Sequence, residues 1–220
     1  MKVENFSRQH EIFDATQFKE QIHIIGCGAT GSAVALNLAK MGIENIHIYD
    51  FDTVEEHNLP NQQFGLKDIG EYKAKALQAN IMAQTGIYVN AHTEKVTGKE
   101  KFKGIVFLLV DSMKARNEIF HKAIKYKPHV KMMIETRMAL RGGSISVVNP
   151  QDLKQCKQFE ETLFSDEQAE VSACGHSVSI ITSANIIANY AVVQVIKQFN
   201  GIEPFGNYYI DTFTDMFVKM

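Results

Sequence analysis

A glycine-rich stretch near the start of the chain has the residue types and spacing of a phosphate-binding turn. It fits the pattern G-x-G-x-x-G between a predicted strand and a predicted helix, the context in which the pattern binds nucleotides. Glycines permit a tight turn and let a phosphate approach the backbone, while the helix N-terminus offers N–H groups and a partial positive charge. We therefore expect a nucleotide to contact Gly26, Gly28, Ala29, Thr30 and Gly31.

A carboxylate follows at the distance expected for a ribose contact. Asp50 ends the second predicted strand, 19 residues after Gly31 (50 − 31). A carboxylate at that position accepts hydrogen bonds from ribose hydroxyls. The glycines and Asp50 do not distinguish NAD, FAD and ATP, and a glycine turn retained only for packing is the alternative interpretation.

The stretch after Asp50 separates these candidates. It resembles the ThiF/MoeB/HesA family, the nucleotide-binding fold of ubiquitin-activating-like enzymes, whose members carry D-x-D-x-V, N-L-x-R-Q and G-x-x-K-[AV] after the second strand. The resemblance extends from about Arg8 to Lys197, and the segment around Asp111 resembles short bacterial and phage ThiF-like proteins. The matching residues in the block are Asp50, Asp52, Val54, Asn58, Leu59, Gln62 and Lys73.

The resemblance implies an ATP-dependent adenylyltransferase. Such enzymes adenylate the C-terminal glycine carboxylate of a small ubiquitin-like or sulfur-carrier protein of the ThiS/MoaD type. By resemblance, Lys73 neutralises the polyphosphate and Arg8 reaches the nucleotide of a partner subunit, which implies a homodimer. Asp50 and Asp52 lie near the ribose, and the phosphates are positioned by Asn58 and Gln62.

Two positions depart from the family pattern. Asn61 replaces the arginine of N-L-x-R-Q, which removes one phosphate-binding guanidinium. We favour an alignment in which Asp111 is the second aspartate of D-x-x-D, so that Leu108 replaces the magnesium-linked first one. Asp111, at the end of a predicted parallel strand, is then the candidate Mg²⁺ ligand, and capping of the next helix is its alternative role.

Two further residues are candidates for contact with substrate. Arg137 ends a strand on the expected ligand edge and could touch substrate or phosphate. Cys174 lies in a segment, 151–177, that resembles a crossover loop. Some relatives use a cysteine there to form a thioester or handle a persulfide, which requires an exposed thiol of lowered pKa. A buried, unreactive thiol is the alternative.

The elements that must position these residues alternate between strands and helices. This order predicts an α/β fold, Rossmann-like, with a mostly parallel sheet covered by helices on both faces. A C-terminal hairpin over 207–220 should add antiparallel strands. We expect a single domain over 1–220 with an N-terminal arm, 1–20. The predicted helices are 33–41, 71–84, 113–125 and 178–199, and the predicted strands are 21–25, 45–49, 88–92, 104–110, 131–135 and 144–148.

Composition excludes several classes of protein. The 220 residues are 45% hydrophobic with a net charge of −2, which argues against a disordered chain and a generic nucleic-acid binder. Three scattered cysteines without C-x-x-C spacing predict no zinc site and a reducing cytoplasm. The long apolar stretch, 178–195, holds several amides and hydroxyls, so we expect a core helix rather than a membrane span.

Two other functions remain open at this stage. One is a catalytically degenerate nucleotide-binding or protein-interaction subunit, which Asn61 and Leu108 favour. The other is an NAD-dependent oxidoreductase, which rests on the glycine turn and Asp50 alone.

Overall fold

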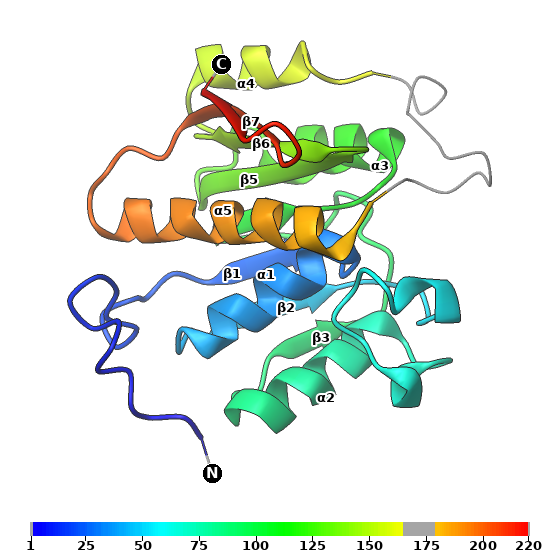
Figure 1. The fold of residues 1–220 in the computed structure, drawn as a ribbon. Coiled ribbons are helices and arrows are strands. Elements are labelled where there is room, and N and C mark those ends of the chain that lie inside the picture. The colour runs from blue at the N-terminus through cyan, green and yellow to red at the C-terminus, as the bar shows by residue number, and fades with distance from the viewer. Residues whose placement is uncertain (1, 165–178, 220) are drawn as a thin grey trace.

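The chain builds one continuous sheet (Figure 1). The computed structural model describes residues 2–164 and 179–219. These residues form eight strands in the order β3-β2-β1-β4-β5-β6-β7-β8. The strands are β1 Ile22–Ile25, β2 Ile46–Tyr49, β3 Asn90–His92, β4 Gly104–Leu108, β5 Val130–Ala139, β6 Gly142–Val148, β7 Gly206–Asp211 and β8 Met216–Lys219.

The sheet has a parallel part and an antiparallel part. Strands β3, β2, β1, β4 and β5 are parallel, whereas β6, β7 and β8 continue the sheet from β5 in antiparallel order. The predicted α/β fold with C-terminal antiparallel strands is therefore confirmed. Because β1 lies between β2 and β4, the strand order reverses at its carboxyl end, which is where open parallel sheets bind ligands.

Helices cover both faces of the sheet. Helices α1, α2 and α5 pack over one hydrophobic core, and α3 and α4 pack over a second core on the other face. Neighbouring strand residues alternate between the two cores, so that Ile24 faces α1 and Ile25 faces the opposite side. The helices are α1 Ala29–Lys40, α2 Lys73–Thr85, α3 Met113–Ile119, α4 Leu153–Glu160 and α5 Ile181–Phe199, with short turns of helix at Glu56–Asn58, Leu66–Asp68 and Phe120–Ile124.

Several elements differ in their bounds from the sequence prediction, α1 and α4 among them. Helix α1 begins at Ala29, four residues earlier than predicted (33 − 29), because the helix starts inside the glycine turn. Helix α4 lies in a segment predicted as a polar loop. Asp152 caps it by accepting the N–H groups of Lys154 at 2.8 Å and Gln155 at 3.0 Å, and Cys156 and Phe159 are its buried residues.

The N-terminal arm packs against the body of the protein. Phe13 is buried, and its ring centroid lies 4.8 Å from that of Phe199 at the end of α5. Within the described residues, none of the helices combines the length and the hydropathy that crossing a membrane would require.

Candidate functional site

The glycine turn lies at the carboxyl end of β1, and its glycines differ in what they tolerate. Gly26 has a φ of +98°, and a Cβ there would come within 2.6 Å of the Leu109 carbonyl oxygen. A Cβ on Gly31 would lie 1.9 Å from the Gly26 carbonyl oxygen. Packing therefore accounts for both glycines. Around Gly28, by contrast, a Cβ would meet no heavy atom of the described residues within 4 Å.

Open space at Gly28 adjoins the start of α1. Gly28 is the N-cap residue and provides no side chain to bond the first N–H groups of the 12-residue helix. The first turn of a helix leaves such N–H groups without intrahelical partners and carries a partial positive charge. This part of the turn, which includes Ala29 and Thr30, is thus suited to an anion.

Asp50 connects β2 to the glycine turn. One carboxylate oxygen accepts the Cys27 N–H at 2.7 Å, and the other accepts the Asp52 N–H at 2.9 Å. Burial raises the pKa of the Asp50 carboxyl, and these two N–H groups oppose that rise by stabilising its charged form. Each oxygen retains a lone pair, so Asp50 can still accept a hydrogen bond from a ligand hydroxyl.

Lys73 is held beside the turn by a short antiparallel pairing of the chain. Its backbone N–H donates to the Asp52 carbonyl at 2.8 Å, and Thr53 forms a bridge with Tyr72. The Lys73 side chain is 11% exposed, and its Nζ lies 3.3 Å from Oδ2 of Asp52, whose side chain is 50% exposed. A largely buried ammonium with one half-exposed partner can exchange that carboxylate for a phosphate oxygen.

Hydrogen bonds through Ser32 attach the loop after Asp52 to the glycine turn. The Ser32 hydroxyl donates to the Gly28 carbonyl at 2.7 Å and accepts the Gln63 N–H at 3.1 Å. Asn58 is buried and accepts the Glu55 N–H at 2.9 Å, so its oxygen stabilises the loop. Within the described part of the chain, the buried side-chain oxygen of Gln62 has no hydrogen-bond partner.

Asn61 has a contact of its own in place of the family arginine. Its amide nitrogen donates to the Ser179 hydroxyl at 2.6 Å, two residues before α5. Its side-chain oxygen is buried and lacks a hydrogen-bond partner among the described residues. Asn61 thus joins the loop to the start of α5.

Asp111 follows β4 on the same edge. It is exposed and accepts the Ser112 N–H at 2.8 Å, while Ser112 is the residue that caps α3, so capping is not the role of Asp111. Leu108 is fully buried within β4. The described residues contain no group of three or more His, Cys, Asp or Glu side chains arranged to hold a metal ion.

Sequence reasoning missed a buried ion-pair network on this edge. Glu135 is 0% exposed and pairs with both Arg116 and Arg137. The Arg137 guanidinium is bonded to Glu135 and Thr162, and its contact with substrate stays a prediction. The pairing of Glu135 and Arg116, 19 residues apart, leaves no spacing signal in the sequence.

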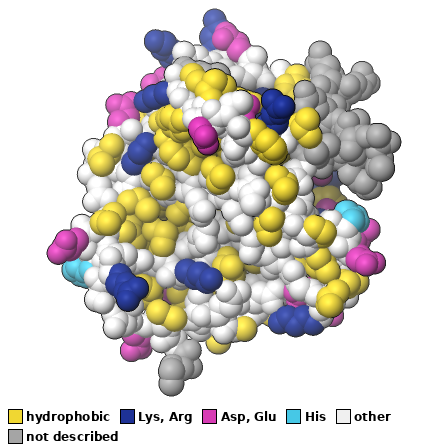
Figure 2. All heavy atoms as spheres, in the orientation of Figure 1, with side chains coloured by type: hydrophobic (Ala, Val, Ile, Leu, Met, Phe, Trp, Pro, Cys, Tyr) yellow, Lys and Arg dark blue, Asp and Glu magenta, His cyan; other side chains and the backbone are white. Residues whose placement is uncertain are grey.

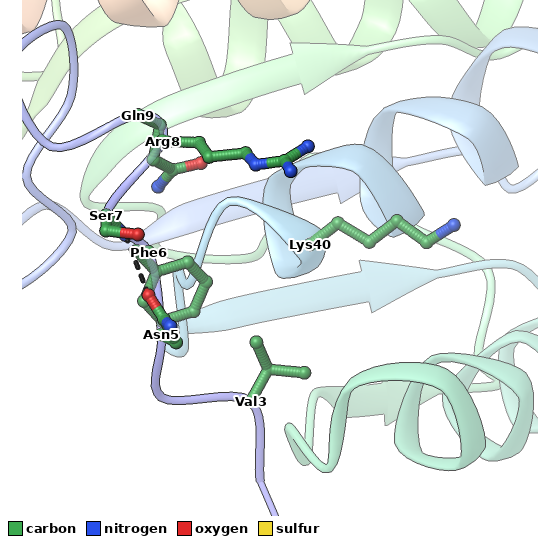
Figure 3. A pocket seen from close by; sticks show the side chains of 7 residues that line it. All are labelled: Val3, Asn5, Phe6, Ser7, Arg8, Gln9 and Lys40. Atoms are coloured by element: carbon green, nitrogen blue, oxygen red, sulfur yellow. Dashed lines mark hydrogen bonds between the residues drawn. The ribbon is translucent and has the colours of Figure 1, made fainter.

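Arg8 lies away from the other candidates. It lines a hollow of about 310 Å³ with Lys40, the last residue of α1, and Figure 3 shows the two side chains extending in the same direction. A 12-residue helix is about 18 Å long, and the glycine turn is at its other end.

Cys174 lies outside the described residues.

Comparison with known proteins identifies the family. Residues 8–217 match the sequence model of the ThiF family. The chain belongs to the ThiF family. Among its curated ThiF relatives, the NEDD8-activating enzyme E1 catalytic subunit of Dictyostelium discoideum is 35% identical over 115 residues, which is 49% of this chain and 26% of that protein. The Escherichia coli sulfur carrier protein ThiS adenylyltransferase is 26% identical over 191 residues, 83% of this chain and 73% of the relative.

Solved structures share the ThiF fold. E. coli MccB determined with AMPCPP and MccA superposes with a TM-score of 0.71 at 17% identity, over 92% of this chain and 63% of MccB. PaaA superposes with a TM-score of 0.68 at 19% identity, again over 92% of this chain. The chain spans only about a quarter of the length of the NEDD8-activating subunits it matches.

Proposed function

We propose that this ThiF-family chain uses ATP to adenylate the C-terminal glycine carboxylate of a small ubiquitin-like or sulfur-carrier protein. A carboxylate oxygen of the carrier attacks the α-phosphorus, the bond to pyrophosphate breaks, and an acyl adenylate and pyrophosphate leave. The observation that supports this most strongly is the position of Lys73, a largely buried cation next to an open glycine turn.

Lys73 supplies the charge that phosphoryl chemistry requires. Negative charge builds up on the phosphate oxygens in the transition state, and a positioned ammonium stabilises it. Asp52 holds the Lys73 ammonium in place before substrate binds, because their side chains lie 3.3 Å apart. The half-exposed Asp52 can then yield to a phosphate oxygen.

The surrounding residues suit the nucleotide itself. Phosphates would approach the backbone at Gly28, where no side chain intervenes, and meet the N–H groups that begin α1. Asp50 would accept the ribose hydroxyls. Among the described residues, the buried side-chain oxygens of Asn61 and Gln62 have no hydrogen-bond partner. These amides would complete the polar surroundings of the ligand, while Asn58 holds the loop in shape.

Asp111 is our candidate for Mg²⁺ binding. Mg²⁺ in nucleotide sites is held by one or two carboxylates together with substrate phosphates, so one exposed carboxylate at the strand end fits this role. A bound Mg²⁺ would neutralise phosphate charge. For Cys174 we propose that its thiolate attacks the acyl adenylate, forming a thioester as the acyl–phosphate bond breaks and AMP leaves, or that it carries a persulfide.

Arg8 supports a homodimer. Because it lies at the opposite end of α1 from its own glycine turn, its proposed contact with phosphate requires the nucleotide of a second copy. A protein partner also suits the face in Figure 2, where hydrophobic side chains gather over α5 and the C-terminal hairpin. Ile186, Val193 and Phe217 are among the exposed residues there. Buried, free Cys27 and Cys156 suit a reducing cytoplasm.

A nucleotide-binding subunit without catalysis is the second candidate. Asn61 favours it, because this position contacts Ser179 and provides no guanidinium for the phosphates. An NAD-dependent oxidoreductase has less support, since Lys73 and Asp52 have no role in hydride transfer.

Pyrophosphate exchange separates the three functions. The chain is incubated with ATP, Mg²⁺, labelled pyrophosphate and a sulfur-carrier protein ending in Gly-Gly. Carrier-dependent incorporation of label into ATP is the result we expect. Tight ATP binding without exchange would favour the non-catalytic subunit, and binding of NAD but not ATP would favour the oxidoreductase.

A further inference from the structure

Every nitrogen of the Arg137 guanidinium has a partner within the chain. Nε donates to Oε1 of Glu135 at 2.6 Å, Nη1 to the Thr162 carbonyl at 2.6 Å, and Nη2 to the Thr162 hydroxyl at 2.8 Å. Arg137 therefore joins the end of β5 to the chain that follows α4. A planar fork of donors suits this arrangement, which the single ammonium of lysine cannot reproduce.

Two aromatic rings lie close to the guanidinium. Its central carbon lies 5.8 Å from the ring centroid of Phe159 and 5.6 Å from that of Phe164. These contacts are within the range of cation–π attraction. Arg137 thus contacts three residues of the segment 159–164 through its hydrogen bonds and these rings.

Glu135 provides a rigid base for the contact. It is 0% exposed and forms a second ion pair with buried Arg116. Arg116 in turn donates to the carbonyls of Leu108 at 3.3 Å and Thr136 at 3.2 Å, so it is anchored to the ends of β4 and β5. In this low-dielectric setting the carboxylate cannot readily change partners.

The same strand reaches the nucleotide site on its other face. Thr136, between Glu135 and Arg137, lies 3.1 Å from the Thr30 hydroxyl of the glycine turn. Glu135 pairs with Leu108, the last residue of β4, so Arg137 lies beyond the carboxyl end of that strand. The tip of β5 therefore contacts the glycine turn on one face and Thr162 on the other.

We infer that Arg137 is a positioning residue that holds residues 159–164 at this edge for the attack of the carrier carboxylate. The inference rests on the proposed adenylation. Because each guanidinium nitrogen is bonded within the chain, we expect the loss of Arg137 to affect turnover with the carrier and not ATP affinity. Small misplacements at a reacting centre have large effects on rate, so the loss of this contact should be measurable.

Two variants and one control test the role. Arg137→Lys keeps the charge beside Glu135 but cannot form both bonds to Thr162, and Thr162→Val removes the hydroxyl acceptor while leaving Arg137 in place. Lys125→Gln is the control. It removes the ion pair between Lys125 and Glu160, the last residue of α4, and so shows whether a general loosening of α4 has the same effects. Each protein is measured for amide hydrogen exchange over 159–164, ATP affinity by calorimetry, and pyrophosphate exchange with a Gly-Gly sulfur carrier.

We expect both variants to speed amide exchange over 159–164 and to lower kcat/KM for the carrier by about tenfold to a hundredfold, with unchanged ATP affinity. Lys125→Gln should leave all three measurements near those of the parent. Weakened ATP binding without faster amide exchange would overturn the inference and make Arg137 a phosphate ligand. If the parent shows no pyrophosphate exchange, the proposed function fails, and unchanged amide exchange in both variants would separately refute the positioning role.

Discussion

The carboxylate of Asp50 accepts the backbone N–H of Cys27 at 2.7 Å and so joins the end of β2 to the turn that follows β1. The same side chain accepts the Asp52 N–H at 2.9 Å. Asp50 is therefore a structural support of the glycine turn as well as our candidate ribose contact. These two roles make its replacement informative.

Asp50→Asn should destabilise the protein. An amide can accept at one oxygen only, so its NH₂ group would face a backbone N–H, and the expected cost is about 1–3 kcal/mol. Urea unfolding measures this loss, and ATP affinity should fall with it. Asp52→Asn is the control for stability, since its partly exposed pairing with Lys73 should contribute no more than about 1 kcal/mol. Equal stability of Asp50→Asn and the parent would contradict the supporting role.

Substitutions at two glycines of the turn should have different effects, one on the stability of the fold and the other on ATP binding. Gly31→Ala places a methyl 1.9 Å from the Gly26 carbonyl oxygen, so the backbone must move, at a cost of at least about 1–3 kcal/mol. The methyl of Gly28→Ala meets no atom of the described residues within 4 Å and should leave the Tm unchanged, while it obstructs the approach of phosphate and weakens ATP binding. Thermal unfolding and calorimetry give both quantities. Unaltered ATP affinity in Gly28→Ala would argue against our placement of the phosphates.

Lys73 should matter for catalysis far more than its neighbour does. Lys73→Gln removes the cation beside the turn, and the loss of one such electrostatic contact costs about 10²–10³ in kcat. Lys75→Gln, two residues further along α2, changes an exposed lysine and should have little effect. Pyrophosphate exchange rates compare the variants, with urea unfolding as a check on folding. A similar small effect of both substitutions would remove Lys73 from the mechanism.

Three histidines on neighbouring strands predict sensitivity to acid. The rings of His23, His47 and His92 stack across β1, β2 and β3, with centroids 5.0 Å and 5.4 Å apart. Burial, helped by the charges of the other two histidines, lowers the pKa of His23 to about 4. Burial also lowers the pKa values of His47 and His92.

The direction of the effect follows from proton linkage. An unfolded histidine titrates near pH 6.5, above the folded pKa of His23, so the unfolded state gains the proton first. Stability is then fully retained above about pH 6.5 and falls towards pH 4, by about 3 kcal/mol for His23. Urea unfolding across this range measures the slope, and His23→Gln should flatten it. An unchanged slope in that variant would show that other groups cause the acid dependence.

Much of the fold followed from local patterns, and the misses have physical causes. The glycine turn and the apolar strands on either side of it predicted β1 and β2 because strand burial and backbone conformation are local properties. The start of α1 was placed too late because Ala29 to Ser32 lack an apolar period. Helix α4 was missed because a polar sequence conceals its buried Cys156 and Phe159, although Asp152 is a recognisable N-cap.

For the candidate site too, some positions could be predicted from the sequence and others could not. The sequence placed Asp50 at the glycine turn through the strand end that it follows. The proposed role of Lys73 comes from family resemblance, because Lys73 and its partner Asp52 lie 21 positions apart in the sequence. The partners of Arg137, Glu135 and Thr162, could not be predicted from the sequence, because they become visible only when strand direction and helix packing are known.

The most direct test of the account is transfer of label from ATP to the carrier. The chain is mixed with Mg²⁺, a sulfur-carrier protein ending in Gly-Gly, and ATP labelled at the α- or the γ-phosphate, with a carrier whose C-terminal carboxylate is amidated as control. We predict that α-label alone appears on the carrier as an adenylate and that the amidated carrier remains unlabelled. Absence of α-label from the carrier, without carrier-dependent formation of labelled AMP, while ATP binding is intact would contradict the proposed adenylation, as would equal labelling of the amidated carrier.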